Sequence, residues 1–170
     1  ILDNGAVAFV TDLEPDPNFG QKVVKSIGGQ FEIVAEQSGW NAAAGGSYDG
    51  ALDSVTLQSD GRVSFSARIA GGSGLVQTFL TGDGSAAVAA AQTTIPTGQL
   101  AAPVALESFA AGATDLQLTW MNAAGDRWCT RADLLGPVAT DICLIVNNEV
   151  RIQEGFRVPG SALTSNVSAI

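Results

Sequence analysis

The sequence predicts an all-β protein built from about three tandem units of four strands each. Three observations lead to this prediction. Apolar residues alternate with polar or small residues at a period of two, one such stretch recurs along the chain, and polar Gly-rich turns separate the stretches. No segment combines helical periodicity with capping residues, so we expect no helices.

The first recurring element is a polar turn that ends in Gly and leads into an alternating strand. Residues 3–13 match residues 59–69, with Val, Phe, a small residue and Leu or Ile on one face. A third copy at 122–134 needs one inserted residue and begins the same face with Trp128. This alternation is typical of a strand with one face buried.

The second recurring element is a hairpin that follows each alternating strand. Its turns are predicted at Gly28-Gly29, Asp83-Gly84 and Asn147-Asn148, because these residue types tolerate positive φ. Residues 86–92 are rich in Ala, but their position directly after a turn predicts a strand rather than a helix.

The two elements divide the chain into a single repeat domain with three units. We expect the units at about 1–50, 51–113 and 114–170, each with four strands. Residues 38–50 and 93–114 are rich in Gly, Ala, Pro and polar residues, which predicts loops.

Four-stranded units in tandem are the building blocks of β-propellers. The turn Asp60-Gly61, the residues Val63 and Phe65, and the turn at 82–84 form a pattern that resembles bacterial extracellular tandem-repeat proteins of the choice-of-anchor type. The match is best over 54–92 and poorest over 121–134. The resemblance implies a secreted, propeller-like protein located outside the cell or at its surface. Closed propellers have about 4–8 blades, so three units predict a partial propeller or half of an oligomeric one.

The charge balance argues against two classes of partner. The 170 residues include 8 Lys and Arg against 17 Asp and Glu, a net charge of −9. Nucleic acids and anionic membranes are bound through clustered basic side chains, so neither is expected as a partner. No apolar run reaches the 18 residues that a membrane-spanning helix needs.

The ends of the chain resemble the two halves of one strand. Residues 165–170 followed by 1–5 match the internal stretch 51–61 in length and apolar placement. We therefore expect an assembly strand in which the tail of one copy completes the first unit of another. Its residues are Ser165, Val167, Ala169, Ile170, Ile1 and Leu2. The alternative is that the remainder of a longer chain supplies the missing strand.

Two cysteines suggest a covalent link. Cys129 and Cys143 lie on successive predicted strands around a turn near Gly136-Pro137, and antiparallel pairing predicts a disulfide between them. The alternative is a pair of small, buried thiols.

Aromatic residues outside the repeated Phe positions are candidates for ligand or partner contact. Trp40, Tyr48 and Trp120 are the residues considered, because exposed aromatic rings stack on sugars and anchor interfaces. Packing beneath loops is the alternative for Trp40 and Tyr48.

One stretch rich in side-chain oxygens is a candidate metal site. Asp12, Glu14, Asp16 and Asn18 alternate along the chain, and Ca²⁺ binds such oxygens. Two prolines interrupt the stretch and EF-hand spacing is missing, so a solvated acidic loop is favoured and no cofactor is predicted.

These features favour a structural or interaction module over an enzyme. The chain has no His, which removes the most common general base, and Asp60 and Asp83 stand beside Gly as turn residues do. We expect a non-enzymatic extracellular module that assembles with itself or with a surface complex. A glycan- or small-ligand-binding module is the alternative, and a carboxylate-based hydrolase is the least favoured hypothesis.

Overall fold

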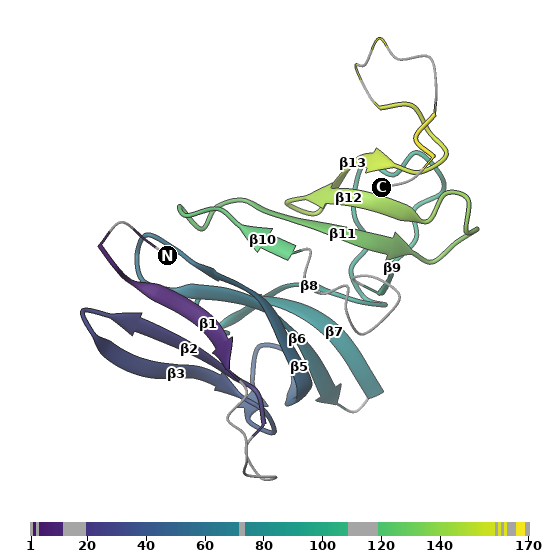
Figure 1. Ribbon diagram of the computed structural model, residues 1–170. Helices are drawn as coiled ribbons and strands as arrows, with labels where there is room; N and C mark the ends of the chain where they lie inside the picture. The colour runs from purple at the N-terminus through teal and green to yellow at the C-terminus, as the bar shows by residue number, and fades with distance from the viewer. Residues whose placement is uncertain are drawn as a thin grey trace.

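The protein is an all-β molecule of three antiparallel sheets that follow one another along the chain (Figure 1). The computed structural model describes residues 2, 4–11, 20–71, 74–108, 119–158, 160, 162 and 166–168, with the backbone alone at 50, 51, 74, 75 and 108. The strands fall where the sequence alternates between apolar and polar or small residues, which agrees with the predicted all-β class.

Sheet 1 has three strands in the order β1-β2-β3. They are β1 (Val7–Thr11), β2 (Lys22–Ile27) and β3 (Gln30–Glu36). The two-residue turn Gly28-Gly29 joins β2 to β3 with φ values of 60° and 79°, as a tight hairpin with two positive φ angles requires. The predicted hairpin at this point is therefore confirmed.

Sheet 2 is central and has five strands in the order β4-β5-β6-β7-β8. They are β4 (Trp40–Asn41), β5 (Gly46–Leu57), β6 (Val63–Gly71), β7 (Gly74–Thr81) and β8 (Ala86–Ala90). The Ala-rich stretch is a strand, because the positive φ of Asp83 turns the chain back onto β7.

Sheet 3 has the path β10-β11-β12-β13, and β9 pairs with β11. Its strands are β9 (Leu106–Ser108), β10 (Thr119–Met121), β11 (Trp128–Leu134), β12 (Ile142–Val146) and β13 (Glu149–Gln153). Asn147 and Asn148 both have positive φ and form the predicted hairpin turn between β12 and β13.

The Gly turns that precede β1, β6 and β11 have the same hydrogen bond in all three sheets. The N–H groups of Gly5, Gly61 and Gly125 donate to the carbonyl oxygens three residues earlier, at distances of 2.9, 3.0 and 3.0 Å. One residue more separates this Gly from the next strand in sheet 3 than in sheet 2, which is the insertion predicted from the sequence.

The hairpins also repeat their geometry. The Asp83 carboxylate accepts from the N–H of Val63 at 2.8 Å, and the Asn147 side-chain oxygen accepts from the N–H of Trp128 at 2.8 Å. A β-bulge interrupts the hairpin pairing in each sheet, with one extra residue at 34, 88 and 151. The register therefore makes β1, β6 and β11 equivalent strands.

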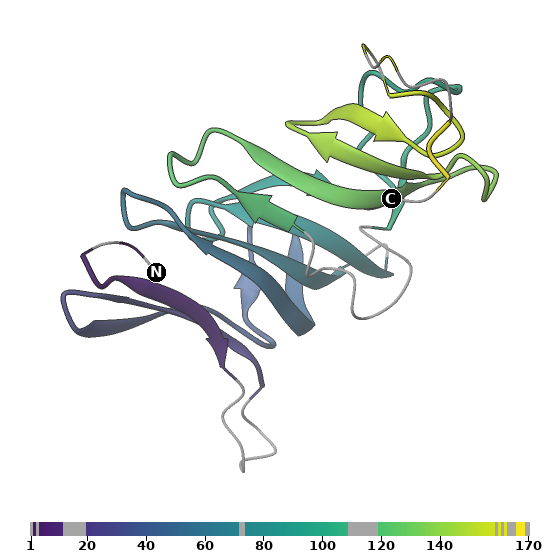
Figure 2. The same cartoon turned by 45° about the horizontal axis from the view of Figure 1, so that its top comes forward.

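This equivalence defines two faces for each sheet. We call one side of each sheet its front face and the opposite side its back face. The front face carries Val7 and Phe9 in sheet 1, Val63, Phe65 and Ala67 in sheet 2, and Trp128 and Thr130 in sheet 3. The sheets lie as successive slanted layers (Figure 2). One apolar cluster joins sheet 1 to sheet 2, and another joins sheet 2 to sheet 3.

The strand count and the unit boundaries differ from the prediction. The expected boundary at residue 50 falls within β5, since sheet 1 ends at Glu36 and sheet 2 begins at Trp40. The predicted loop at 38–50 contains β4 and the start of β5, and that at 93–114 contains β9. Small residues such as Ala and Gly hide a strand from a search for alternation, because they give little hydrophobic contrast. The boundary near 113 lies outside the described residues.

Candidate interaction surfaces

The interface between sheets 1 and 2 pairs the back face of one sheet with the front face of the next. Val23 and Ala35 from sheet 1 and Val63, Phe65 and Leu80 from sheet 2 belong to one buried cluster. Their burial removes apolar surface from water, and this effect is the main source of the interface's stability.

A buried ion pair joins the same two sheets. The Lys25 ammonium, on the back face of sheet 1, lies 2.7 Å from the Asp83 carboxylate in the β7–β8 turn and 3.5 Å from Glu32. Burial lowers the pKa of Lys25, but the hydrogen bond and charge of Asp83, together with Glu32, outweigh it, and the pKa lies above its ordinary value of 10.5. The pair fixes how the hairpin of sheet 2 sits on sheet 1.

The interface between sheets 2 and 3 repeats this arrangement. Phe79 from the back face of sheet 2 packs on Trp128 from the front face of sheet 3, with ring centroids 5.6 Å apart and planes tilted by 47°. Leu134 and Ile145, also on the front face of sheet 3, are fully buried in the same cluster. Trp128 is therefore a core residue, as its position in the repeat predicts.

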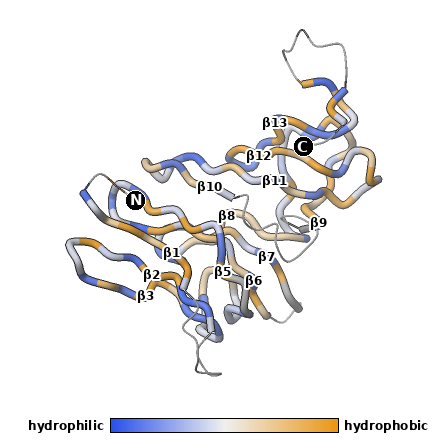
Figure 3. The backbone as a smooth tube through the Cα atoms, viewed as in Figure 1, coloured by the Kyte–Doolittle hydropathy of each residue, from blue (hydrophilic) through white to orange (hydrophobic). Residues whose placement is uncertain are grey.

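The front face of sheet 1 has the same apolar pattern, and no strand of the described residues covers it. Phe9 is 38% exposed, Phe31 73% and Ile33 54%, whereas Phe65, the equivalent of Phe9 in sheet 2, is fully buried. The register places Phe9, Val24 and Ile33 side by side across the three strands. The apolar positions of β1–β3 are visible at this end of the molecule in Figure 3.

The back face of sheet 3 is the second open surface, at the opposite end of the three layers (Figure 1). Trp120 on β10 is 49% exposed and stands opposite Cys129, which is paired with Val146. Leu144 and Ile152 extend the row, and both are partly exposed. A monomeric protein rarely shows an extended apolar patch to water, so these two faces are the strongest candidates for contact with another molecule.

The predicted disulfide is absent, and the register explains why. Cys129 pairs with Val146 while Cys143 pairs with Ala132, so the two cysteines lie three positions apart along the strands and on opposite faces of sheet 3. Both are free thiols. Burial raises the pKa of both, that of Cys143 to about 12, with Asp133 and Asp141 adding to the shift there. The prediction was wrong because the β11–β12 connection is longer than the one that would set the two cysteines opposite each other.

The three candidate aromatic residues have different environments. Tyr48 is buried, its ring packs on Phe65, and its hydroxyl oxygen accepts from the Asn41 side-chain amide at 2.6 Å, so its expected role in ligand contact is corrected to a core role. Burial raises the pKa of Tyr48, although the Asn41 hydrogen bond opposes the shift. Trp40 is 68% exposed on β4, and Trp120 belongs to the open face of sheet 3.

The predicted assembly strand is described only in part. The N–H of Leu2 donates to the carbonyl of Ala6, within the first Gly turn. Val167 exchanges two backbone hydrogen bonds of 2.9 Å with Gly155 and Phe156 of its own chain. These bonds pair the tail with its own chain, so the N–H and C=O of Val167 are not available to a neighbour's sheet. Ile1, Ser165, Ala169 and Ile170 lie outside the described residues.

Asp60 and Asp83, which stand beside Gly in two turns, have structural contacts. Asp83 holds Lys25 and the start of β6, and exposed Asp60 is paired with Arg62, whose hydrogen bonds lower the pKa of Asp60. Within the described ranges, no group of three or more His, Cys, Asp or Glu side chains is arranged to hold a metal ion. The Ca²⁺ candidates Asp12, Glu14, Asp16 and Asn18 lie outside the described residues.

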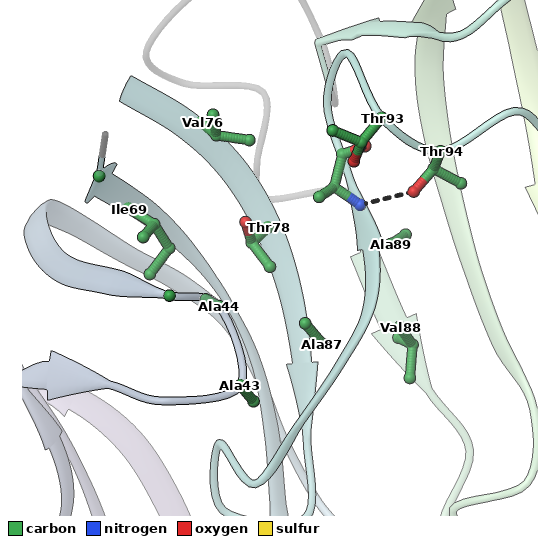
Figure 4. Close-up of a pocket in the computed structure, with 13 residues that line it drawn as sticks. Ala43, Ala44, Ile69, Val76, Thr78, Ala87, Val88, Ala89, Thr93 and Thr94 are labelled. Atoms are coloured by element: carbon green, nitrogen blue, oxygen red, sulfur yellow. Dashed lines mark hydrogen bonds between the residues drawn. The ribbon is translucent and has the colours of Figure 1, made fainter. Parts of the chain in front are cut away.

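A hollow of about 360 Å³ lies at the end of sheet 2 away from the Gly turns (Figure 4). Its walls come from the turn after β4, from β6 and β7, and from β8 and the residues after it, and they are mostly small and apolar. Hydroxyl groups of Thr78, Thr93 and Thr94 add polar sites, and that of Thr94 accepts from the Ala90 N–H at 2.9 Å. Such a hollow suits a small, uncharged group.

Sequence reasoning did not identify the open faces as the site. The signal was available, because Val7, Phe9, Phe31 and Ile33 alternate in the repeated pattern and begin the first unit, which has no preceding sheet in the chain as given. The Lys25–Asp83 pair left no signal, since the two residues are 58 positions apart.

The chain was compared with protein families, curated proteins and solved structures. Neither protein-family models nor curated proteins nor solved structures give a match to this chain. Over the described residues, the fold contains no helix long and apolar enough to cross a membrane.

Proposed function

We propose that this chain is a non-enzymatic structural or interaction module of tandem four-stranded units, part of a propeller-like array that assembles with copies of itself. The observation on which this rests is the contrast between inner and outer faces of one architecture. The two inner interfaces are buried and mainly apolar, and the two outer faces expose apolar side chains of the same kind to water.

The recurring turns, hairpins and bulges support the tandem-repeat part of the proposal. Each sheet has the same Gly turn and the same bulge position, and equivalent side chains in sheets 2 and 3 accept a hydrogen bond from the first N–H of β6 and of β11. Units that stack only on their neighbours need capping surfaces at the ends of the array. Here the two outer faces combine exposed apolar residues, such as Phe31 and Trp120, with a few charged ones, such as Glu36 and Arg131. Together with the resemblance to choice-of-anchor repeat proteins, this favours a location outside the cell or at its surface.

The decisive experiment measures mass against concentration. In sedimentation velocity or light scattering, the apparent mass should rise above the chain mass of 17.3 kDa as the protein is concentrated, and fall on dilution. The matched variants are Phe31→Glu, on an open face, and Val138→Glu, on an equally exposed loop residue outside both faces. We expect the first to lower the mass and the second to leave it unchanged. A wild-type chain that stays monomeric at all concentrations would refute the proposal.

Deleting residues 163–170 tests the tail as an assembly strand. If the tail completes a neighbour's first sheet, its deletion should abolish association. If association depends on the open faces alone, the deletion should leave it intact, because the backbone hydrogen bonds of Val167 run to Gly155 and Phe156 of its own chain.

A glycan- or small-ligand-binding module is the second candidate, because Trp40 is 68% exposed and sheet 2 has a hollow lined by small side chains and threonine hydroxyls. Binding to a glycan array that is lost in Trp40→Ala and kept in Val138→Ala would favour it.

A further inference from the structure

We propose that two copies of this chain associate head to tail, with the front face of sheet 1 in one copy seated on the back face of sheet 3 in the next. This inference rests on the proposed self-assembly and adds its polarity and its contact residues. The partner is therefore a second copy of the chain.

The two interfaces within the chain show how one sheet packs on the next. In each, the back face of a preceding sheet packs on the front face of the following one. The free front face of sheet 1 and the free back face of sheet 3 are the two halves of one more such interface. A front-to-front or back-to-back contact has no precedent within the molecule.

The register identifies which side chains would meet. On the back faces, Val23, Phe79 and Leu144 occupy the same position, directly before the bulge. On the front faces, Val7 takes the place of Val63 and Trp128. Because Phe79 packs on Trp128 between sheets 2 and 3, the equivalent contact between copies is Leu144 on Val7.

The side-chain sizes are compatible with this contact. Leu144 and Val7 are smaller than Phe79 and Trp128, but Phe9 stands where sheet 3 has only Thr130. A large ring on the open front face thus offsets the smaller pair beside it, and volume-conserving exchange of this kind is well tolerated in apolar packing.

The charges are compatible at the position of the inner ion pair, and Arg131 beside Leu144 and Glu149 beside Val146 are the charged residues that the back face of sheet 3 brings to the contact. At the interface of sheets 1 and 2, Lys25 on the back face meets Asp83 from the hairpin of the front sheet. In the head-to-tail contact, Val146 stands in the place of Lys25 and Ser26 in the place of Asp83. A neutral residue replaces each member of the ion pair, so the contact buries no charge at this point.

Complementation between two blocked variants tests the polarity. The front-blocked variant is Phe31→Glu with Ile33→Glu, and the back-blocked variant is Trp120→Glu with Leu144→Glu. Each variant alone should remain at the chain mass of 17.3 kDa. Their mixture should form a one-to-one complex of twice that mass, because the intact back face of the first still fits the intact front face of the second.

Other outcomes would overturn the inference separately from the proposed function. A back-blocked variant that still dimerises alone, or a mixture that stays monomeric while the wild type associates, would refute head-to-tail packing and leave self-assembly standing. A wild type that never associates refutes both. Trp120→Glu alone replaces the double variant if circular dichroism shows that Leu144→Glu disturbs the fold.

Cys129 gives a second readout that does not depend on mass. Its thiol lies on the back face of sheet 3, whereas the buried Cys143 serves as an internal control. We expect concentrated wild-type protein to protect Cys129 from alkylation, and the front-blocked variant at equal concentration to lose this protection. Phe31 and Ile33 belong to the opposite end of the chain, so such a change must pass through another copy. An unchanged alkylation rate would contradict the proposal.

Discussion

Phe9 and Phe65 occupy the same position in two sheets of one chain and have different surroundings. Both face the same side as a Val two residues earlier, and both stand opposite an apolar residue of the neighbouring strand. Phe65 is fully buried under sheet 1, whereas Phe9 is 38% exposed because no described sheet precedes it. The comparison shows that alternation determines which face of a sheet is apolar, while the neighbouring sheet determines whether that face is dry.

The largest expected effect comes from truncating these two rings. Phe65→Ala should lower the free energy of unfolding by about 3–5 kcal/mol, because it leaves a cavity against Tyr48 in a packed core. Phe9→Ala should cost about 1 kcal/mol or less, since its ring is already partly hydrated. Urea unfolding of dilute protein measures both, and equal losses would mean that the front face of sheet 1 is covered.

Removing the ion pair between sheets 1 and 2 should have the next largest effect on the free energy of unfolding. Asp83→Asn should keep the hydrogen bond to the N–H of Val63, as Asn147 does at the equivalent place in sheet 3, and lose the charge that faces Lys25. We expect a loss of about 1–2 kcal/mol, because the Lys25 charge stays buried while Asp83 itself is partly solvated.

The pH dependence of the same pair has a defined sign. The pKa of Lys25 in the folded chain lies above 10.5, so its protonation stabilises the fold below that pH, and the contribution disappears as the pH rises through the folded pKa. Unfolding free energies measured between pH 9 and pH 11.5 should fall in the wild type and fall less in Asp83→Asn. Parallel curves would show that Asp83 does not set this pKa.

Substitutions in two equivalent Gly turns should have a smaller effect on stability. Gly5 and Gly61 both have φ near 80°, a conformation that costs other residues about 1–2 kcal/mol. A Cβ at Gly5 would meet no atom within 4 Å, but at Gly61 it would meet the Cδ1 atom of Ile27 at 2.8 Å. Gly61→Ala should therefore lower the thermal midpoint further than Gly5→Ala, and identical shifts would argue against the contact with sheet 1.

The smallest thermodynamic effect is expected at Phe31. Phe31→Ser should change the unfolding free energy of dilute protein by about 0.5 kcal/mol or less, because the ring is 73% exposed. At high concentration the wild-type thermal midpoint should rise, since association stabilises the folded state, and that of Phe31→Ser should stay constant. A concentration-dependent midpoint in both proteins would place the contact elsewhere.

The parts of the fold that the sequence predicted are those encoded by local chemistry. The hairpins at Gly28-Gly29 and Asn147-Asn148 are present because positive φ selects Gly and Asn, and β8 is a strand because it follows such a turn. The predictions that failed concern residues far apart in the sequence, or strands whose side chains differ little in hydrophobicity. β4 and β9 were missed because short strands with few alternating side chains resemble loops.

The candidate site was harder to predict, because it depends on how sheets stack. Tyr48 was expected at a ligand site, but the position of β5 beside β6 puts its ring against Phe65. Cys129 and Cys143 were expected to face each other, but a register difference of three residues sends their side chains to opposite faces. Trp120 was chosen as a candidate and is half exposed, although its sheet face could not be assigned without the pairing of β10 to β11.

The extra residue in each hairpin also bears on the geometry of any larger array. A bulge increases the local twist of the strand pair that contains it, and here it recurs at the same register position in all three sheets. The hairpin of each layer therefore receives a similar addition to its twist from the backbone, beside the further irregularities of β5–β6 in sheet 2 and β9–β11 in sheet 3. We expect the pitch of a multi-copy array to be set by these single-residue insertions, so removing one would change its curvature even where the apolar contacts between layers were kept.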